Sequence, residues 1–206
     1  MDGHLVDGWT RGSLPDTLRP MASPKTVRIN RAPVLTLWAA IVAERLGHTR
    51  AAALTYGRTV AGLNAASKAR GLGIAEPEKE TKRKKPAPVK GRREEIHLLG
   101  RTFDAVETEE GWRAIDGGRA VSAESVERYL ETKFGDDLAA VETALRALAR
   151  SRPPRRLAEE AYALYERFRP AVPRTVRGWG AAGELDLGLI RSLAKASARG
   201  RAATGG

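Results

Sequence analysis

The feature that most restricts how this chain can fold is the segment of residues 75–93, AEPEKETKRKKPAPVKGRR. It combines three prolines with many charges and almost no apolar side chains. Such a stretch buries too little apolar surface to offset the entropy lost on ordering. It therefore predicts a flexible basic linker between two modules, residues 25–74 and 94–196. Residues 1–24 are expected to be a disordered or untranslated extension, and residues 197–206 a disordered tail.

The composition places further bounds on the protein. The chain has 206 residues and no cysteine, which excludes disulfides, thiolate metal sites and thiol nucleophiles. No stretch approaches the roughly 18 apolar residues that a membrane helix needs, and the first residues lack the pattern of a signal peptide. Met21 follows a segment without periodicity and is a second candidate start of translation. We expect a cytoplasmic protein with no membrane association.

The first module is predicted to contain two helices. The first, from Pro33 to Leu46, is apolar on nearly every side, as is typical of a central, buried helix. The second follows Thr49, a good N-cap, and extends to about Arg70. Within it Ala53, Gly57 and Ala61 recur every four residues. One smooth face therefore allows another helix to approach closely.

The second module is predicted to be α+β. Residues 96–99, 101–106, 112–115 and 119–121 are short strand-like runs separated by glycine-containing turns, a pattern that indicates an antiparallel hairpin or meander. Apolar residues at helical spacing then mark three helices, the first of them capped by Ser122. A last short helix is expected to be capped by Asp186 and to pack through Leu189, Ile190 and Leu193. The predicted fold class is mainly α: an N-terminal helical hairpin module, a basic flexible linker, and a C-terminal module combining a small antiparallel hairpin with a helix bundle.

Positive charge is concentrated in the first half of the chain. The formal net charge is +11, and residues 25–91 contain 14 Lys and Arg against 4 Asp and Glu. This asymmetry favours a polyanionic partner. The densest cluster is Lys82–Lys85 with Arg92 and Arg93, and flexible cations of this kind bind phosphates by releasing counterions. The alternative is a solvated linker whose charge keeps the protein soluble.

Residues 39–58 resemble the centre of a bacterial helix-turn-helix, with Ala43 four positions before Gly47. The resemblance makes the second helix the recognition helix. It assigns groove-facing positions to Thr49, Arg50, Thr55 and Arg58. His48 and Leu54 depart from the pattern, and an ordinary two-helix hairpin with a glycine corner produces the same sequence.

A second resemblance extends over more of the chain. It is carried by the runs RAPVLTLW at 31–38, VAGLN at 60–64, FRP at 168–170, GWG at 178–180 and LDL at 185–187. Together they resemble an uncharacterised bacterial protein family. The family implies no activity and no catalytic residue, but it suggests that the two halves of the chain belong together.

Enzyme chemistry has few candidates in this sequence. Beyond the N-terminal extension the histidines are His48 and His97, and no histidine pair has the spacing of metal ligands on a helix. Glycine-rich phosphate loops are also missing. We expect no catalytic residue, no cofactor and no metal. An enzyme would need a pocket that converges on His97, Arg101 or the hairpin.

These observations favour a non-enzymatic protein that associates with nucleic acid, with DNA preferred over RNA as the ligand. The residues expected to contact phosphates are Arg50, Arg58, Lys82, Arg83, Lys84, Lys85, Arg92 and Arg93. The alternative is a module for protein–protein interaction, or a homo-oligomer formed through residues 33–63, with no role in nucleic-acid binding.

Overall fold

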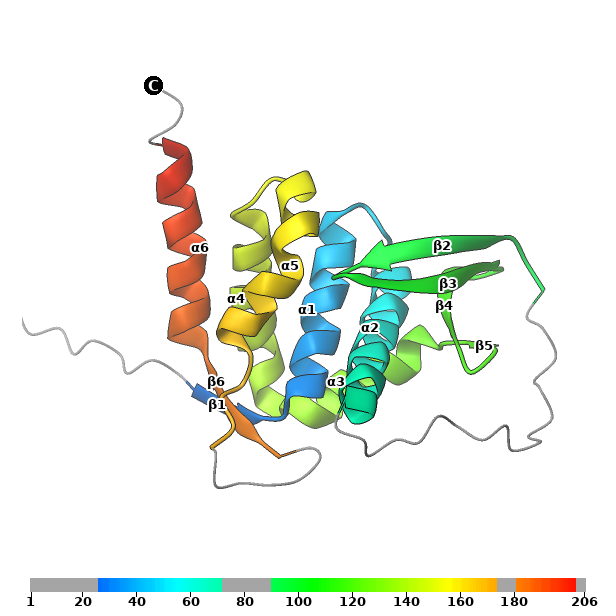
Figure 1. The fold of residues 1–206 in the computed structure, drawn as a ribbon, viewed down its shortest axis with the longest axis horizontal. Coiled ribbons are helices and arrows are strands. Elements are labelled where there is room, and N and C mark those ends of the chain that lie inside the picture. Colours follow the sequence, from blue (N-terminus) through cyan, green and yellow to red (C-terminus); the bar gives the residue numbers. More distant parts are fainter. Residues whose placement is uncertain (1–25, 72–89, 174–180, 203–206) are drawn as a thin grey trace, which may run out of the picture.

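The computed structural model describes residues 26–71, 90–173 and 181–202. Within them the chain forms six α-helices, a short 3-10 helix and two antiparallel sheets (Figure 1). The helices are α1 (Arg31–Arg45), α2 (Arg50–Gly71), α3 (Ala123–Phe134), α4 (Leu138–Arg150), α5 (Pro154–Phe168) and α6 (Leu187–Ala202), with the 3-10 helix η1 at Gly135–Asp137. The strands are β1 (Thr26–Ile29), β2 (Arg93–Leu98), β3 (Arg101–Thr108), β4 (Gly111–Asp116), β5 (Arg119–Ala120) and β6 (Gly183–Asp186). The architecture is mainly helical with small β elements, which confirms the predicted fold class at this level.

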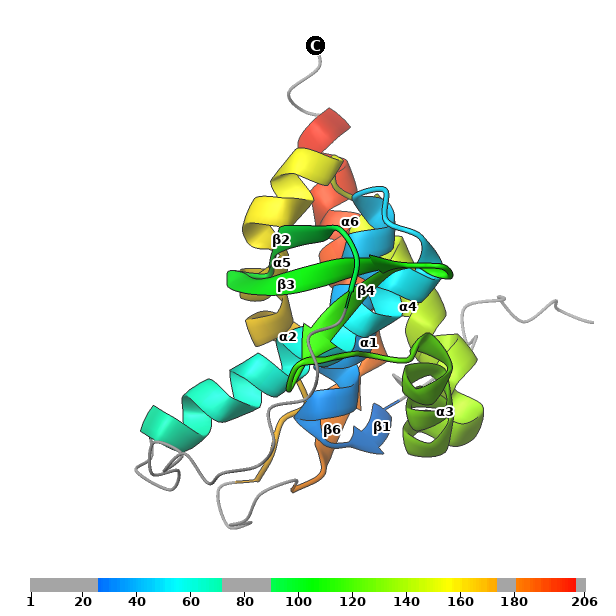
Figure 2. The same cartoon turned by 90° about the vertical axis from the view of Figure 1, so that its right-hand side faces the viewer.

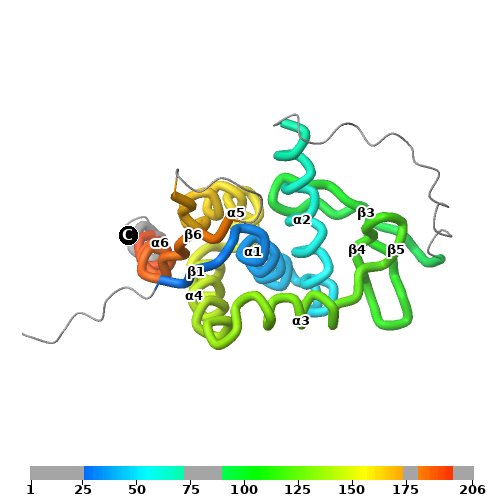
Figure 3. Tube along the Cα trace, turned by 90° about the horizontal axis from the view of Figure 1, so that it is seen from below, coloured from blue at the N-terminus to red at the C-terminus, as the bar shows by residue number. Residues whose placement is uncertain are grey.

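Helix α1 lies in the middle of the molecule. Every residue from Pro33 to Ala43 is buried, as expected for a helix that is apolar on nearly all sides. Seen from below, α2 lies on one side of α1 and α4 and α5 lie on the other (Figure 3). The helix therefore contributes apolar surface to all of its neighbours at once.

Helices α1 and α2 pack at close range through the smooth face of α2. Ala53 and Ala61 are buried, and a Cβ atom at Gly57 would collide with the backbone carbonyl oxygen of Thr36 in α1. The predicted close approach is therefore made within one chain, between the first two helices. The Oγ1 atom of Thr49 accepts a hydrogen bond from the amide of Ala52 at 3.4 Å, in keeping with its predicted capping role.

Strands β2 to β5 form one antiparallel sheet in sequential order, which confirms the predicted meander. The register pairs Ile96 with Phe103 and Ala105 with Ala114. Strand β4 packs against α2, and the amide of Ala114 donates a hydrogen bond to Oγ1 of Thr55 at 3.0 Å. Strand β2 begins at Arg93, so this residue belongs to the sheet and not to the linker predicted for residues 75–93.

Helices α3, α4 and α5 pack around α1 and close the core. The Ser122 side chain accepts a hydrogen bond from the amide of Ser125, which confirms the predicted cap of α3. Trp38 in α1 is fully buried, and its Nε1 donates to the carbonyl oxygen of Ala161 in α5 at 2.8 Å. Its ring also meets the ring of Phe168 edge to face, with centroids 5.4 Å apart.

A single cluster of buried apolar residues includes members from both predicted modules. Val34 and Trp38 come from the first, and Leu145, Leu157 and Tyr165 from the second. The boundary suggested by the charged segment therefore does not separate two hydrophobic cores.

Strands β1 and β6 form a second sheet of two strands that the sequence did not reveal. Val27 pairs with Leu185 in antiparallel register. Each strand has only four residues, and the partners lie far apart in the chain, so neither carries a recognisable hairpin signal. Gly183 at the start of β6 lies against the backbone of Ala171, where a Cβ atom would have no room.

Helix α6 lies at the edge of the molecule and packs against α4 (Figures 1 and 2). Oδ1 of Asp186 accepts hydrogen bonds from the amides of Gly188 and Leu189, at 2.7 and 3.0 Å, which confirms the predicted cap. Leu187, Ile190 and Leu193 are buried, whereas Leu189, expected in the core, is 38% exposed. The helix extends through Ala202, so the predicted tail at 197–206 begins as helix. Among the described residues, no helix has the length and apolar character needed to span a bilayer.

Candidate nucleic-acid interface

Arg50 lies at the start of α2, where it is enclosed by carboxylates. Its guanidinium contacts Glu142 at 3.0 Å and Glu44 and Glu127 at 3.4 Å each. Arg146 joins the same network through Glu44 and Glu142, at 2.6 and 2.8 Å. The network connects α1, α2, α3 and α4.

The protein itself already compensates the charge of Arg50. Partial burial acts to lower the pKa of the guanidinium, but hydrogen bonding and attraction to Glu142, with attraction to Glu44, outweigh burial and raise it. A phosphate at this position would have to compete with three carboxylates. Arg50 is therefore less suited to contact a phosphate than an arginine without carboxylate partners.

The other positions that the helix-turn-helix resemblance assigns to a DNA groove divide into exposed and buried ones. Arg58 is exposed and lies over the ring of Tyr129 in α3, with 4.9 Å between its guanidinium carbon and the ring centroid. Thr55 is fully buried, because the sheet covers this side of α2. The expectation that Thr55 faces a groove is wrong.

The basic segment that follows α2 is only partly described. Lys82, Arg83, Lys84 and Lys85 lie outside the described residues. Arg92 is exposed, with its guanidinium carbon 5.9 Å from the centroid of the Trp112 ring on β4. Arg93 is the first residue of β2.

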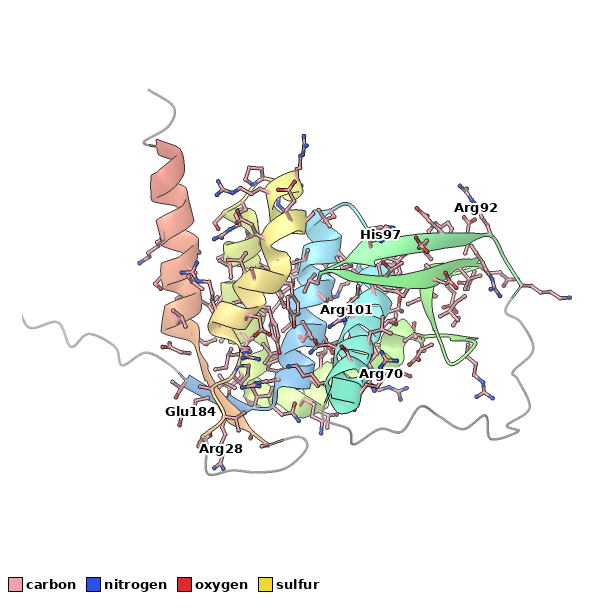
Figure 4. All side chains as sticks on the ribbon, in the orientation of Figure 1. Arg28, Arg70, Arg92, His97, Arg101 and Glu184 are labelled. Atoms are coloured by element: carbon pink, nitrogen blue, oxygen red, sulfur yellow. The ribbon has the colours of Figure 1, made fainter. Side chains whose placement is uncertain are left out.

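A group of cations that the sequence did not single out lies where four elements meet. It consists of Arg31 at the start of α1, Lys68 near the end of α2, Arg101 at the start of β3 and Arg169 directly after α5. We call these four residues the cationic cluster. All four are half-buried. Figure 4 shows Arg101 beside the helices and Arg70, an exposed neighbour of Lys68, below it at the end of α2.

Hydrogen bonds to the protein hold two members of the cationic cluster in place. Nη2 of Arg101 donates to Oδ1 of the buried Asn64 at 3.2 Å, and the Tyr162 hydroxyl donates to the same oxygen at 3.3 Å. Nε of Arg31 donates to the carbonyl oxygen of Pro170 at 3.1 Å. These bonds fix each guanidinium while leaving its other nitrogens free of carboxylates in the described part of the chain.

Compensating acids are scarce around the cationic cluster. Arg169 contacts Glu166 at 3.0 Å, but within residues 26–71, 90–173 and 181–202 no carboxylate pairs with Arg31, Lys68 or Arg101. Partial burial and the positive charges of Arg169, Arg31 and Arg101 lower the pKa of Lys68, opposed by Glu166. The cations of this group thus repel one another, and an anion bound between them would offset that repulsion.

Two other groups of arginines on the described surface include members that are paired with carboxylates. A depression at the C-terminal ends of α1 and α4 is lined by Ile41, Glu44, Arg45, Arg146, Ala149 and Arg150. Arg146 is paired there with Glu44 and Glu142, and the negative ends of two helix dipoles favour the other two arginines. At the start of α5, Arg156 contacts Glu160 at 2.6 Å and Arg152 contacts it at 3.2 Å. The cationic cluster is the stronger candidate for an anion.

The sequence carried only one indication of this site. Asn64 is a polar residue at a buried position of α2, and Lys68 follows one turn later on the same side of the helix. The other cations come from segments far apart in the chain, so no linear motif joins them. The family models, curated proteins and solved structures compared with this chain include no match to it.

Proposed function

We propose that this protein binds nucleic acid through sequence-independent contacts between the cationic cluster and the phosphate backbone, with DNA preferred over RNA. The observation that carries the proposal is the proximity of Arg31, Arg101 and Arg169 to Lys68, with Glu166 the one carboxylate of the described chain that acts on Lys68. Lys and Arg side chains that neutralise phosphates release condensed counterions, which drives this kind of binding.

The proposal also includes the basic segment that follows α2 in the sequence. Helix α2 ends at Gly71, three residues beyond Lys68, and the sequence then continues to Lys82–Lys85. A phosphate chain bound at the cationic cluster would lie near the start of this segment. Its lysines and Arg83 would then contact neighbouring phosphates, which fix position and affinity but read no bases.

The residues proposed here differ from those expected from the sequence in one respect. Arg50 is enclosed by glutamates, and Arg58 rests on Tyr129 away from the cationic cluster. Arg31, Lys68, Arg101 and Arg169 take their place. Arg92 remains a candidate beside Trp112, because an aromatic ring next to a cation is suited to an unpaired base.

The test is fluorescence anisotropy with labelled duplex DNA and single-stranded RNA over a series of salt concentrations. We expect affinity to fall steeply as salt rises. The slope of log K against log salt should decrease by about 0.9 for each phosphate of the duplex that a variant no longer neutralises. Lys68→Gln and Arg101→Gln should each reduce that slope, and replacement of Lys82–Lys85 by alanine should reduce it further.

Arg155→Gln is the matched control, because Arg155 is a highly exposed cation at the opposite end of α5 from Arg169. It removes the same charge and should leave the slope close to that of the unchanged protein. If neither ligand binds at low salt, the proposal is wrong. An equal effect of Arg155→Gln and Arg101→Gln would show that only net charge matters.

The alternative hypothesis is an oligomer formed through residues 33–63. It required the apolar face of α1 and the smooth face of α2 to be open to a partner. Both faces are buried within one chain.

A further inference from the structure

We propose that Asn64, Lys68 and Arg101 form a binding site for the terminal phosphate of a nucleic acid strand. The inference deepens the proposed function, and rests on it, by assigning the cationic cluster to a strand end rather than to internal phosphates. Its starting point is the buried amide of Asn64, which faces these cations.

Asn64 can donate to a ligand while it holds Arg101. Its residue exposure is only 7%, and Oδ1 already accepts from Arg101 and Tyr162. Within the described residues the Nδ2 amide of Asn64 donates to no protein acceptor, since both hydrogen bonds of this side chain are made by Oδ1. An amide nitrogen in that position offers a hydrogen bond to an oxygen arriving from outside.

Cationic donors lie near Asn64. Lys68 is one helical turn further along α2 on the same side, and Arg101 is in direct contact with Asn64. Arg31 and Arg169 lie close enough for their charges to act on Lys68. Such an arrangement favours an oxyanion over a neutral acceptor and repels a cation.

The charge excess matches a terminal phosphate better than an internal one. Among the described residues, four cations against the carboxylate of Glu166 leave three positive charges uncompensated. An internal phosphodiester carries one negative charge and two free oxygens, whereas a phosphate monoester carries a charge of about −1.5 to −2 at neutral pH and three acceptor oxygens. Because the cations are half-buried, their attraction to the additional negative charge of a monoester is screened less than it would be in open water.

The discriminating experiment compares one single-stranded DNA oligonucleotide in three forms: with a 5′-phosphate, with a 3′-phosphate and with hydroxyl groups at both ends. Binding is measured by anisotropy with the label placed away from the end under test. We expect one phosphorylated form to bind about tenfold tighter than the hydroxyl form, as the gain of charge-assisted hydrogen bonds predicts. A nucleoside monophosphate should compete with it, and a nucleoside should not.

Two variants test the residues. Arg101→Gln removes a half-buried charge without opening the core, and Asn64→Ser removes the amide donor. Each should abolish the preference for the phosphorylated oligonucleotide while the hydroxyl form still binds, whereas Arg155→Gln should preserve it. Melting temperature verifies that each variant is folded, and Arg101→Gln remains decisive if Asn64→Ser does not fold.

The outcomes separate this inference from the proposed function. Equal affinity for all three oligonucleotides would overturn the proposal of a terminal-phosphate site and leave general nucleic-acid binding in place. Retention of the preference in Arg101→Gln would also overturn that proposal, because the terminal phosphate would then bind elsewhere. If no oligonucleotide binds at low salt, both proposals are overturned.

Discussion

Gly57 allows α2 to lie directly against the backbone of α1. A Cβ atom there would meet the carbonyl oxygen of Thr36 well inside contact distance and the amide nitrogen of Ala40 at 3.0 Å. Both atoms belong to the backbone of a buried helix, so neither can rotate away as a flexible side chain does. We expect Gly57→Ala to lower the free energy of unfolding by about 3 kcal/mol, the upper part of the range for overpacking, as measured by urea denaturation.

Gly62, in the same helix, provides the control for this substitution. It is exposed, and nothing lies within 4 Å of a Cβ atom built there. Gly62→Ala should stabilise the protein by about 0.5–1 kcal/mol, because alanine has the higher helix propensity. If Gly57→Ala proved as stable as Gly62→Ala, the close contact between the two helices would be refuted.

Single residues were predictable where the cause is local. The spacing of Ala53, Gly57 and Ala61 indicates close helix packing, although it does not say whether the partner is α1 or a second copy of the chain. Thr55 was misassigned because its environment is set by β4, which follows some 60 residues later and donates an amide to its hydroxyl. A hydroxyl on a helix carries no local sign of such a partner.

At the scale of secondary-structure elements, the network around Glu142 joins four helices. Partial burial acts to raise the pKa of Glu142, but hydrogen bonds from Arg146 and Arg50 outweigh it and hold the pKa below its ordinary value of 4.5. A carboxyl whose pKa is lower in the folded state stabilises the protein above its unfolded pKa. That contribution is lost as the pH falls through the folded pKa.

We therefore expect Glu142→Gln to be less stable than the unchanged protein at neutral pH, with the difference shrinking as the pH falls below about 4.5. Urea denaturation at a series of pH values measures this directly. Glu131→Gln, which removes an exposed carboxylate from α3, should instead follow the unchanged protein. A pH-independent deficit in Glu142→Gln would show that its role is packing and not charge.

Elements with strong local signals matched their predictions, whereas strands β1 and β6 were not predicted. Ser122 and Asp186 cap α3 and α6 as expected, because capping depends on residues within one turn. Strands β1 and β6 have four residues each, and each is stabilised by a partner from the other end of the described chain. No window of neighbouring residues contains both halves of that signal.

For the whole molecule, the shared core predicts that the first two helices cannot fold without the rest. Residues 25–74 expressed alone would expose the faces of α1 that pack on α3, α4 and α5. We expect this fragment to show low helicity by circular dichroism and no cooperative thermal transition, and to regain structure when co-expressed with residues 90–206. A cooperative transition in the isolated fragment would show that it is an independent domain.

The candidate site was less predictable than the fold, because its residues also come from distant segments of the chain. Composition and charge distribution favoured a polyanionic ligand, but they directed attention to contiguous cations such as Lys82–Lys85. The cationic cluster gathers one residue each from α1, α2, β3 and the end of α5, and a linear pattern cannot represent that convergence. Arg50 was chosen for its place in a motif, whereas the acids that compensate it come from three other helices.

The central position of α1 has a consequence for how the protein is made. Trp38 hydrogen-bonds to Ala161, 123 residues further along the chain, so at roughly 5–20 residues per second about 6 to 25 s of translation separate the two partners. During that interval the most apolar helix leaves the ribosome without most of the surfaces that will cover it. We expect α1 to be accessible to chaperones while the rest of the chain is made, and slow translation to favour aggregation of the nascent chain.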